Sequence, residues 1–378
     1  MSSPYSSYAR QLLRSVDLTR GSEELLETPK YWKPDVFNLF LEKCDEAIFD
    51  DCSVGLKLSK SAPPFAERVI AANPTVKPAV LRVRAYCRLG SAYRAVGDYT
   101  EAHRTYELAL AEGDLPTVEA ADLYRRLAYL RLYQGHGPEA ESLIDEAIRI
   151  QRLETDLIDR HELGRCLVAR ATIRRESGNL GASILDLTAA LNHLDVGRGP
   201  RPYFAAAHNL AVDLVNGGSP DQLATALKRL GVARKKLRSF KKRHYAKYKL
   251  KWLQGLIQAR FGATAQAELS HKAARRGLID MGASYEVVMI SLDLTALYLP
   301  QGRLTELREL ACETVELCTS LSLNRQASSA LRLWHHATER QQLTLELVAS
   351  ARATVAEHTI PAGSSPKASI PAGKRSDV

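Results

Sequence analysis

A pattern of about 40 residues recurs through most of this chain, and it limits the possible folds more than any other feature of the sequence. Its clearest copy runs from Leu81 to Pro116, where two stretches with apolar and small residues at helical spacing flank a Gly97-Asp98 turn. Glycine ends a helix readily because it adopts a left-handed backbone conformation at little cost. We therefore expect a series of antiparallel helix pairs, each packed against the next.

Later turns repeat this arrangement, although their sequences vary. Ala140 follows Gly135 at the same distance as Ala102 follows Gly97, which is typical of a repeated helix crossing. The fourth and fifth copies depend mainly on spacing. The remaining turns are expected at Gly178-Asn179, Gly217-Gly218, Gly262 and Gly302.

The copy from Leu81 to Pro116 resembles the tetratricopeptide repeat (TPR) at nearly every signature position of that family. The chain as a whole is similar to bacterial TPR proteins of unassigned role and to the helical sensor halves of TPR-containing regulators. The resemblance implies an all-α, right-handed TPR-like solenoid of five to six helix pairs, with small residues where the two helices of a pair cross. The matching residues are Tyr86, Leu89, Gly90, Tyr93, Ala102, Tyr106 and Ala109.

The chain divides into four expected segments. Residues 1–33 are predicted to be a partly flexible N-terminal segment, residues 34–80 an atypical helical capping unit, and residues 81–357 the TPR array with its terminal helices. Residues 358–378 are rich in proline, glycine and serine without an apolar period, which is typical of a disordered tail. Regulators of the similar kind carry a DNA-reading helix-turn-helix before their repeats, and we recognise none in residues 1–60.

The sequence lacks the common signatures of catalysis and metal binding. It contains no GxxxxGK[ST], GxGxxG, HExxH or GxSxG motif, so we predict a protein that is not an enzyme and has no cofactor and no metal. His335 and His336 are adjacent on an expected helix and point roughly 100° apart, which argues against a shared ion. Cys312 is expected to pack in the core. Six cysteines without a CxxC pair, and no secretory or membrane-spanning apolar run, favour a cytoplasmic protein with reduced thiols.

In TPR proteins the first helix of each pair lines a concave groove, so the resemblance implies a binding surface there. Its N-terminal half is expected to be rich in surface arginines, which pair with the carboxylates of an acidic peptide or chain terminus. Its C-terminal half, which includes Met289 and Leu292, is expected to be apolar and to suit a hydrophobic helix face. Alternatively, these arginines are ordinary solvated residues. The candidate groove residues are Arg84, Arg94, Arg125, Tyr129, Arg165, His208 and Trp252.

Residues 228–251 concentrate the positive charge of the chain, because they hold twelve Lys and Arg and no acid while the whole chain has a formal net charge of +9. Aromatic residues, among them Tyr248 and Trp252, are interleaved with these cations and could stack on bases. An acidic protein partner and an inert solvated surface are the alternatives to nucleic acid. The candidate contact residues are Lys235, Lys236, Arg238, Lys241, Lys242, Arg243 and Lys247.

These observations predict a non-catalytic scaffold or adaptor that recognises a partner protein or peptide in the concave groove. The expected partner has acidic and apolar determinants. The alternative function is an adaptor associated with RNA or DNA through residues 228–251. No membrane association is expected, and the sequence leaves the oligomeric state open.

Overall fold

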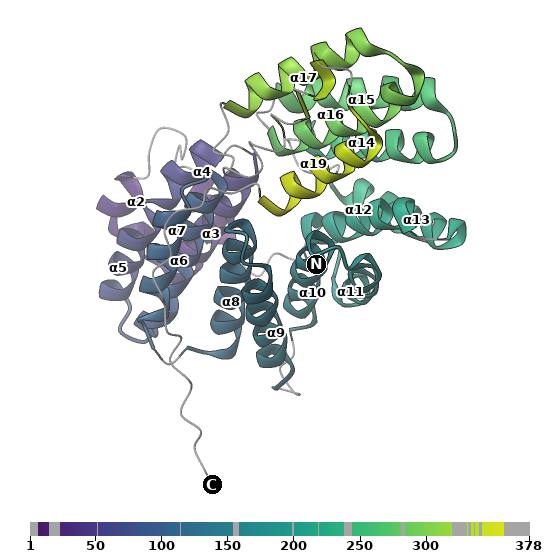
Figure 1. The fold of residues 1–378 in the computed structure, drawn as a ribbon. Helices are drawn as coiled ribbons and strands as arrows, with labels where there is room; N and C mark the ends of the chain where they lie inside the picture. The colour runs from purple at the N-terminus through teal and green to yellow at the C-terminus, as the bar shows by residue number, and fades with distance from the viewer. Residues whose placement is uncertain are drawn as a thin grey trace.

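The computed structural model (Figure 1) describes residues 7–14, 23–50, 52–113, 115–153, 159–198, 200–217, 219–237, 244–280, 284–319, 331, 334, 335, 337–339 and 342–358. These residues form helices and the turns between them, with no β-strand, which confirms the prediction of an all-α fold. None of the helices in these ranges is both long enough and apolar enough to cross a membrane.

Six helix pairs make up the repeat array in the described part of the chain, in agreement with the five to six expected. The two helices of each pair pack against each other, and successive pairs stack into a curved solenoid (Figure 1). The pairs are α6 (Pro78–Ala95) with α7 (Tyr99–Leu110), α8 (Thr117–Tyr133) with α9 (Gly137–Leu153), α10 (Arg160–Glu176) with α11 (Leu180–His193), α12 (Pro200–Gly217) with α13 (Pro220–Leu237), α14 (His244–Arg260) with α15 (Thr264–Ile279), and α16 (Ser284–Tyr298) with α17 (Leu304–Thr319).

Glycine follows the first helix of most pairs in the left-handed conformation that the sequence predicts. A side chain with a Cβ would be strained at such a φ, so these positions favour glycine. In the fourth pair the turn follows Gly217, the last residue of α12, and Gly218 lies outside the described residues. The φ angles are 86° at Gly97, 76° at Gly135, 79° at Gly178, 76° at Gly262 and 65° at Gly302.

Close crossings within the pairs depend on a glycine that faces a large ring. A Cβ at Gly90 would lie 2.6 Å from Cε1 of Tyr106, and the Tyr106 side chain is fully buried. The fifth pair repeats this contact, because a Cβ at Gly255 would lie 2.7 Å from ring atoms of His271. The expected close approach of the helices at Gly90 is therefore confirmed. The fifth repeat, which matches the pattern weakly, has the same contact between a glycine and a ring.

We predict that Gly90→Ala destabilises the protein by about 1–3 kcal/mol, because the buried Tyr106 ring has to move. Gly231→Ala in the interior of α13 is the matched control, since a Cβ there meets no atom within 4 Å. That change should stabilise the protein by roughly 0.5–1 kcal/mol, because alanine is the better helix former. Urea unfolding followed by circular dichroism measures both, and two changes of the same sign would contradict the crossing geometry.

A group of helices precedes the array and packs on α6, the first helix of its first pair. Phe65 contacts both Phe37 and Phe40 edge to face, with ring centroids 5.6 and 5.4 Å apart, and Leu81 of α6 belongs to the same apolar core. Residues 34–72 thus form a helical unit against α6, while the boundaries of the four expected segments stay a prediction and the tail from residue 359 lies outside the described residues. The helices are α1 (Ser7–Arg14), α2 (Glu23–Glu27), η1 (Pro29–Tyr31), α3 (Pro34–Asp50), α4 (Cys52–Ser59) and α5 (Ala62–Ala72).

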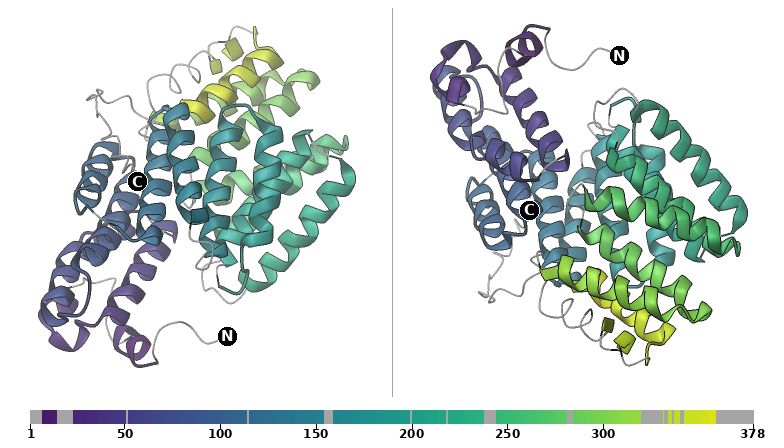
Figure 2. Two further views of the ribbon diagram at one scale, coloured as in Figure 1. Left: turned by 90° about the horizontal axis from the view of Figure 1, so that it is seen from below. Right: turned by 90° about the horizontal axis from the view of Figure 1, so that it is seen from above.

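The last described helix, α19 (Leu345–His358), does not extend the array. It contacts α8, α10 and α16, and the views in Figures 1 and 2 show it lying alongside α16 and reaching the N-terminal repeats. These three helices are the first helices of the second, third and sixth pairs, and α6, α8, α10, α12, α14 and α16 contact one another in succession. The layer of first helices must therefore curve around α19, which lies on its concave side.

Candidate binding groove on the inner helices

The inner helices α6, α8, α10, α12, α14 and α16 contain every residue that was predicted to line a groove, and the concave side of their layer is here called the groove. Which of these side chains are available to a partner depends on their contacts within the chain. Their positions are Arg84 and Arg94 in α6, Arg125 and Tyr129 in α8, Arg165 in α10, His208 in α12 and Trp252 in α14.

Asp122 of α8 is the centre of an ion-pair network that joins the first two inner helices. Its carboxylate accepts hydrogen bonds from Arg126 Nε at 2.9 Å and from Arg88 Nη1 at 3.3 Å, and it pairs with Arg125. Arg126 Nη1 also donates to Ser91 Oγ of α6 at 2.6 Å. Burial would raise the pKa of Asp122, but the attraction of Arg126, Arg125 and Arg88 outweighs it and holds the pKa well below its usual range.

Two further predicted arginines of the N-terminal half, Arg84 and Arg165, also have acidic partners. Arg84 donates to Glu119 Oε1 from Nε at 2.9 Å and from Nη2 at 2.6 Å, and Arg165 Nη1 donates to Glu162 Oε1 at 2.8 Å. Arg125 is only 7% exposed, so the expectation that it is a surface residue is wrong. The repeat pattern alone could not show these pairs, in which an acid of the same helix or of the next inner helix contacts the guanidinium of Arg84, Arg125 or Arg165.

Arg94 is the exception among the predicted groove arginines. Its guanidinium carbon lies 5.6 Å from the ring centroid of Tyr129 and 5.0 Å from that of Tyr133, and Tyr133 stacks on Tyr99. The buried Nε of Arg94 has no hydrogen-bond partner, and Arg94 has no acidic partner among the described residues. Aromatic rings hold a guanidinium in place without neutralising its charge, so Arg94 is free to pair with a carboxylate.

A series of polar contacts links the last four inner helices. Arg175 Nη1 of α10 donates to Asp213 Oδ1 of α12 at 3.4 Å. His208 Nε2 of α12 lies 3.2 Å from the Lys249 carbonyl oxygen of α14, and Lys249 Nζ lies 3.6 Å from Glu286 Oε1 of α16. Each contact joins one inner helix to the next and fixes their relative positions.

His208 is neutral in this environment. It is 2% exposed, and burial lowers its pKa to about 3, with the charge of Lys249 acting in the same direction. The carbonyl oxygen of Lys249 can only accept a hydrogen bond, so His208 carries its proton on Nε2 and donates to that oxygen. The predicted groove residue is therefore part of the packing between α12 and α14.

We predict that acid unfolds the wild-type protein more readily than His208→Gln, in which the side-chain amide can donate to Lys249 in place of the ring. In the unfolded chain a histidine takes up a proton below about pH 6.5, whereas folded His208 stays neutral down to about pH 3. Folding stability of the wild type should consequently fall by an additional ~1.4 kcal/mol for each unit that the pH is lowered between about 6.5 and about 3. Urea unfolding at pH 7, 6, 5 and 4.5 measures the difference in slope, and equal slopes would contradict the prediction.

Trp252 connects this series of contacts to α19. Its Nε1 donates to Asp293 Oδ2 of α16 at 2.7 Å, and Lys249 Nζ lies 4.6 Å from its ring centroid. Asp293 also pairs with Arg352 of α19, whose Nη1 lies 3.5 Å from the Met289 carbonyl oxygen. Because Trp252 is only 6% exposed, the expectation that it can stack on a base is wrong. The indole instead orients the carboxylate that holds α19.

The basic run is only partly described. Lys235 of α13 is exposed, and so is Lys247 of α14, whose Nζ lies 5.3 Å from the Tyr248 ring centroid. Lys236 belongs to α13, but its side chain lies outside the described residues, as do Arg238, Lys241, Lys242 and Arg243. The described residues of the run thus contribute exposed lysines from two different helices.

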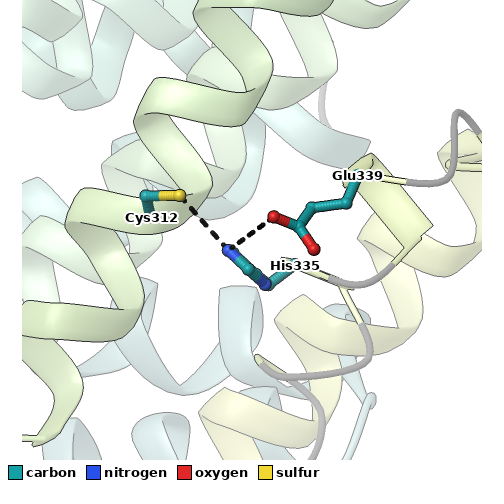
Figure 3. Close-up of side chains that lie close together, drawn as sticks. All are labelled: Cys312, His335 and Glu339. Atoms are coloured by element: carbon teal, nitrogen blue, oxygen red, sulfur yellow. Dashed lines mark hydrogen bonds and ion pairs between the residues drawn. The ribbon is translucent and has the colours of Figure 1, made fainter.

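The environment of Cys312 in α17 differs from the one predicted. It is exposed rather than packed in the core, so that prediction is wrong. Figure 3 shows its Sγ facing Nε2 of His335, at 3.3 Å, with Glu339 beside the same nitrogen. The sequence shows no local signal for this group, because Cys312 lies 23 residues before His335. His336 lies outside the described residues.

No family model and no curated protein matches the chain. The crystal structure of a Rap protein complexed with Competence and Sporulation Factor is similar to it, with a TM-score of 0.60 at 13% sequence identity, over 83% of this chain and 85% of that chain. Aspartyl phosphate phosphatase F from Bacillus subtilis aligns over 91% of this chain and 97% of its own, at 12% identity and a TM-score of 0.44. BtubC from P. vanneervenii aligns over 61% and 92%, at 16% identity and a TM-score of 0.48.

At 13% sequence identity, the similarity to the Rap protein is a similarity of fold. The chain is a TPR-like helical solenoid, as the resemblance of its repeats implies.

Proposed function

We propose that this protein is a non-catalytic binding protein whose groove receives a helical or extended segment of a partner protein. The observation that carries the proposal is the position of α19, which lies in the groove against three inner helices from distant repeats. A surface that holds a helix of its own chain in this way has the shape and chemistry to hold a helix of another. A protein of similar fold, the Rap protein, is complexed with Competence and Sporulation Factor, which is consistent with a binding role for this fold.

The buried face of α19 indicates which apolar partner the groove fits. Val348, Ala351 and Val355 are 4%, 2% and 0% exposed, and their spacing places them on one face of the helix. They belong to the same apolar core as Met289 and Leu292, which were expected to make the C-terminal half of the groove apolar. The matching partner is an amphipathic helix with small apolar residues along one face and a cation positioned to reach Asp293.

The N-terminal half of the groove suits an acidic determinant. Arg94 is oriented by Tyr129 and Tyr133 and has no acidic partner among the described residues. A carboxylate of the partner would supply the missing acceptor in a charge-assisted hydrogen bond. Arg84, Arg125 and Arg165 contribute less, because acids of the chain already neutralise them.

A photo-crosslinking amino acid at Tyr129 tests the proposal in native extracts. We expect a discrete protein adduct that resists nuclease. In a protein that also carries Arg352→Glu, which should release α19, an excess of the peptide 342–358 should reduce this adduct. The matched control is Leu185 on the outer helix α11, which is 72% exposed and should give no such adduct. Nuclease-sensitive adducts would favour the nucleic-acid alternative, and equal adducts at both positions would contradict a role for the groove.

A further inference from the structure

Three different metal-ligating side chains converge at the C-terminal end of the array. Cys312 Sγ lies 3.3 Å from His335 Nε2, and that nitrogen lies 3.9 Å from Glu339 Oε1. All three potential ligand atoms lie within 4.8 Å of one another (Figure 3). Among the described residues, this is the one group of three or more such side chains with this convergence.

The orientation of the imidazole distinguishes this group from a catalytic triad. In a nucleophilic triad the thiol and the acid contact opposite nitrogens of the histidine, so that the acid orients the base. Here the thiol and the carboxylate both face Nε2. One N–H cannot donate well to two acceptors, whereas a cation between the three atoms would contact all of them.

The donor set selects the class of ion. A thiolate, an imidazole and a carboxylate together suit a borderline divalent ion such as Zn²⁺, and they do not suit Mg²⁺ or Ca²⁺, which prefer oxygen donors. Ligand bonds of about 2.0–2.3 Å to a common ion leave the donor atoms roughly 3–4 Å apart, close to the separations seen here. The side chains of His335 and Glu339 are 22% and 53% exposed, so an ion can enter from solvent and keep a water or a partner's side chain as its fourth ligand.

We propose that Cys312, His335 and Glu339 bind one Zn²⁺-type ion with an open fourth position. The ion would join α17 to the segment at residues 335–339, which immediately precedes α19 in the chain. Metal binding at this site would therefore fix the point from which α19 enters the groove. The proposal depends only on the three ligands and holds whether or not the groove binds a partner.

Titration of the reduced full-length protein with Co²⁺ tests the site. We expect one equivalent to bind with a sulfur-to-cobalt charge-transfer band, and Zn²⁺ to displace it and abolish the band. Cys312→Ser should remove the band, whereas Cys52→Ser, a change at a free cysteine of α4, should leave it intact. His335→Ala and Glu339→Gln should retain a sulfur-containing site but weaken Co²⁺ affinity by roughly 10-fold or more.

Loss of binding through misfolding is excluded by circular dichroism of each variant, together with native mass spectrometry of the zinc-loaded protein. A band that survives in Cys312→Ser, or a binding stoichiometry that none of the three substitutions changes, would overturn the proposal. Absence of Co²⁺ and Zn²⁺ binding at micromolar concentrations by the folded wild-type protein would overturn it equally. In that case the thiol and imidazole form only a hydrogen bond.

Discussion

Asp122→Ala should destabilise the protein by about 3–5 kcal/mol, because it removes the acid shared by Arg88, Arg125 and Arg126. The more exposed Asp45 remains for Arg88 and Arg126, but it makes no ion pair with Arg125. The side chains of Arg125 and Arg126 are 9% and 7% exposed, so solvent cannot compensate. Urea unfolding at pH 7 measures the loss. Glu146→Ala is the matched control, because it breaks a more exposed pair with Arg149 and should cost no more than about 1 kcal/mol.

The same network predicts that the contribution of Asp122 to folding stability decreases in acid. Since the pKa of Asp122 in the folded protein is below that in the unfolded chain, its contribution is complete above the unfolded pKa of about 4 and is lost as the pH falls further. The difference in stability between wild type and Asp122→Ala should therefore shrink in acid. A constant difference from pH 7 to pH 3 would indicate that Asp122 acts through packing and not through charge.

Arg352→Glu should release α19 from the groove, because a second carboxylate would then face Asp293. Tethering gives α19 an effective concentration on the order of millimolar, so a wild-type peptide of residues 342–358 cannot compete with it at micromolar concentration. In the Arg352→Glu protein the groove and Asp293 are unchanged, and the peptide retains its arginine. We expect its apparent affinity to rise by about 100-fold or more, measured by fluorescence anisotropy of the labelled peptide.

Ala353→Glu is the matched control for this experiment, since the adjacent position on α19 is exposed and the same charge is introduced. It should leave peptide binding as weak as in the wild type. Hydrogen exchange of residues 345–358 gives a second measurement, with faster exchange expected only in Arg352→Glu. If both variants behave alike, the Asp293–Arg352 pair does not hold α19 in place.

Local signals accounted for most of the fold. The turns at Gly97, Gly135, Gly178, Gly262 and Gly302 could be predicted because a left-handed glycine depends on its immediate neighbours. The fifth repeat was weaker in sequence because its counterpart to Tyr106 is His271, a residue outside the usual pattern, although it meets Gly255 in the same way. The fifth repeat is therefore recognised from the packing between α14 and α15 rather than from the residue pattern along either helix.

The groove could be predicted only in outline. Placing Arg94 and Tyr129 on inner helices followed from the repeat register, but the partners of the arginines did not. Asp122 and Glu119 reach α6 from α8, across separations of about 35 residues, so their pairing depends on how far one inner helix is shifted along the other. The position of α19 was equally hidden, because its sequence shows an ordinary alanine-rich helix and nothing that specifies its contacts with α8.

The contacts of α19 also determine how this protein should unfold. A solenoid whose repeats contact only their neighbours behaves as a one-dimensional chain, and its ends can fray or melt separately. Here a helix from the C-terminus is packed against α8 and α10, so the last repeats and the second and third repeats are joined by contacts that span most of the sequence. Through α19, the C-terminal end of the array is thus in contact with its N-terminal half. Its melting should therefore be a single cooperative transition with slow folding, and cutting the chain between α17 and α19 should convert it into stepwise loss of repeats.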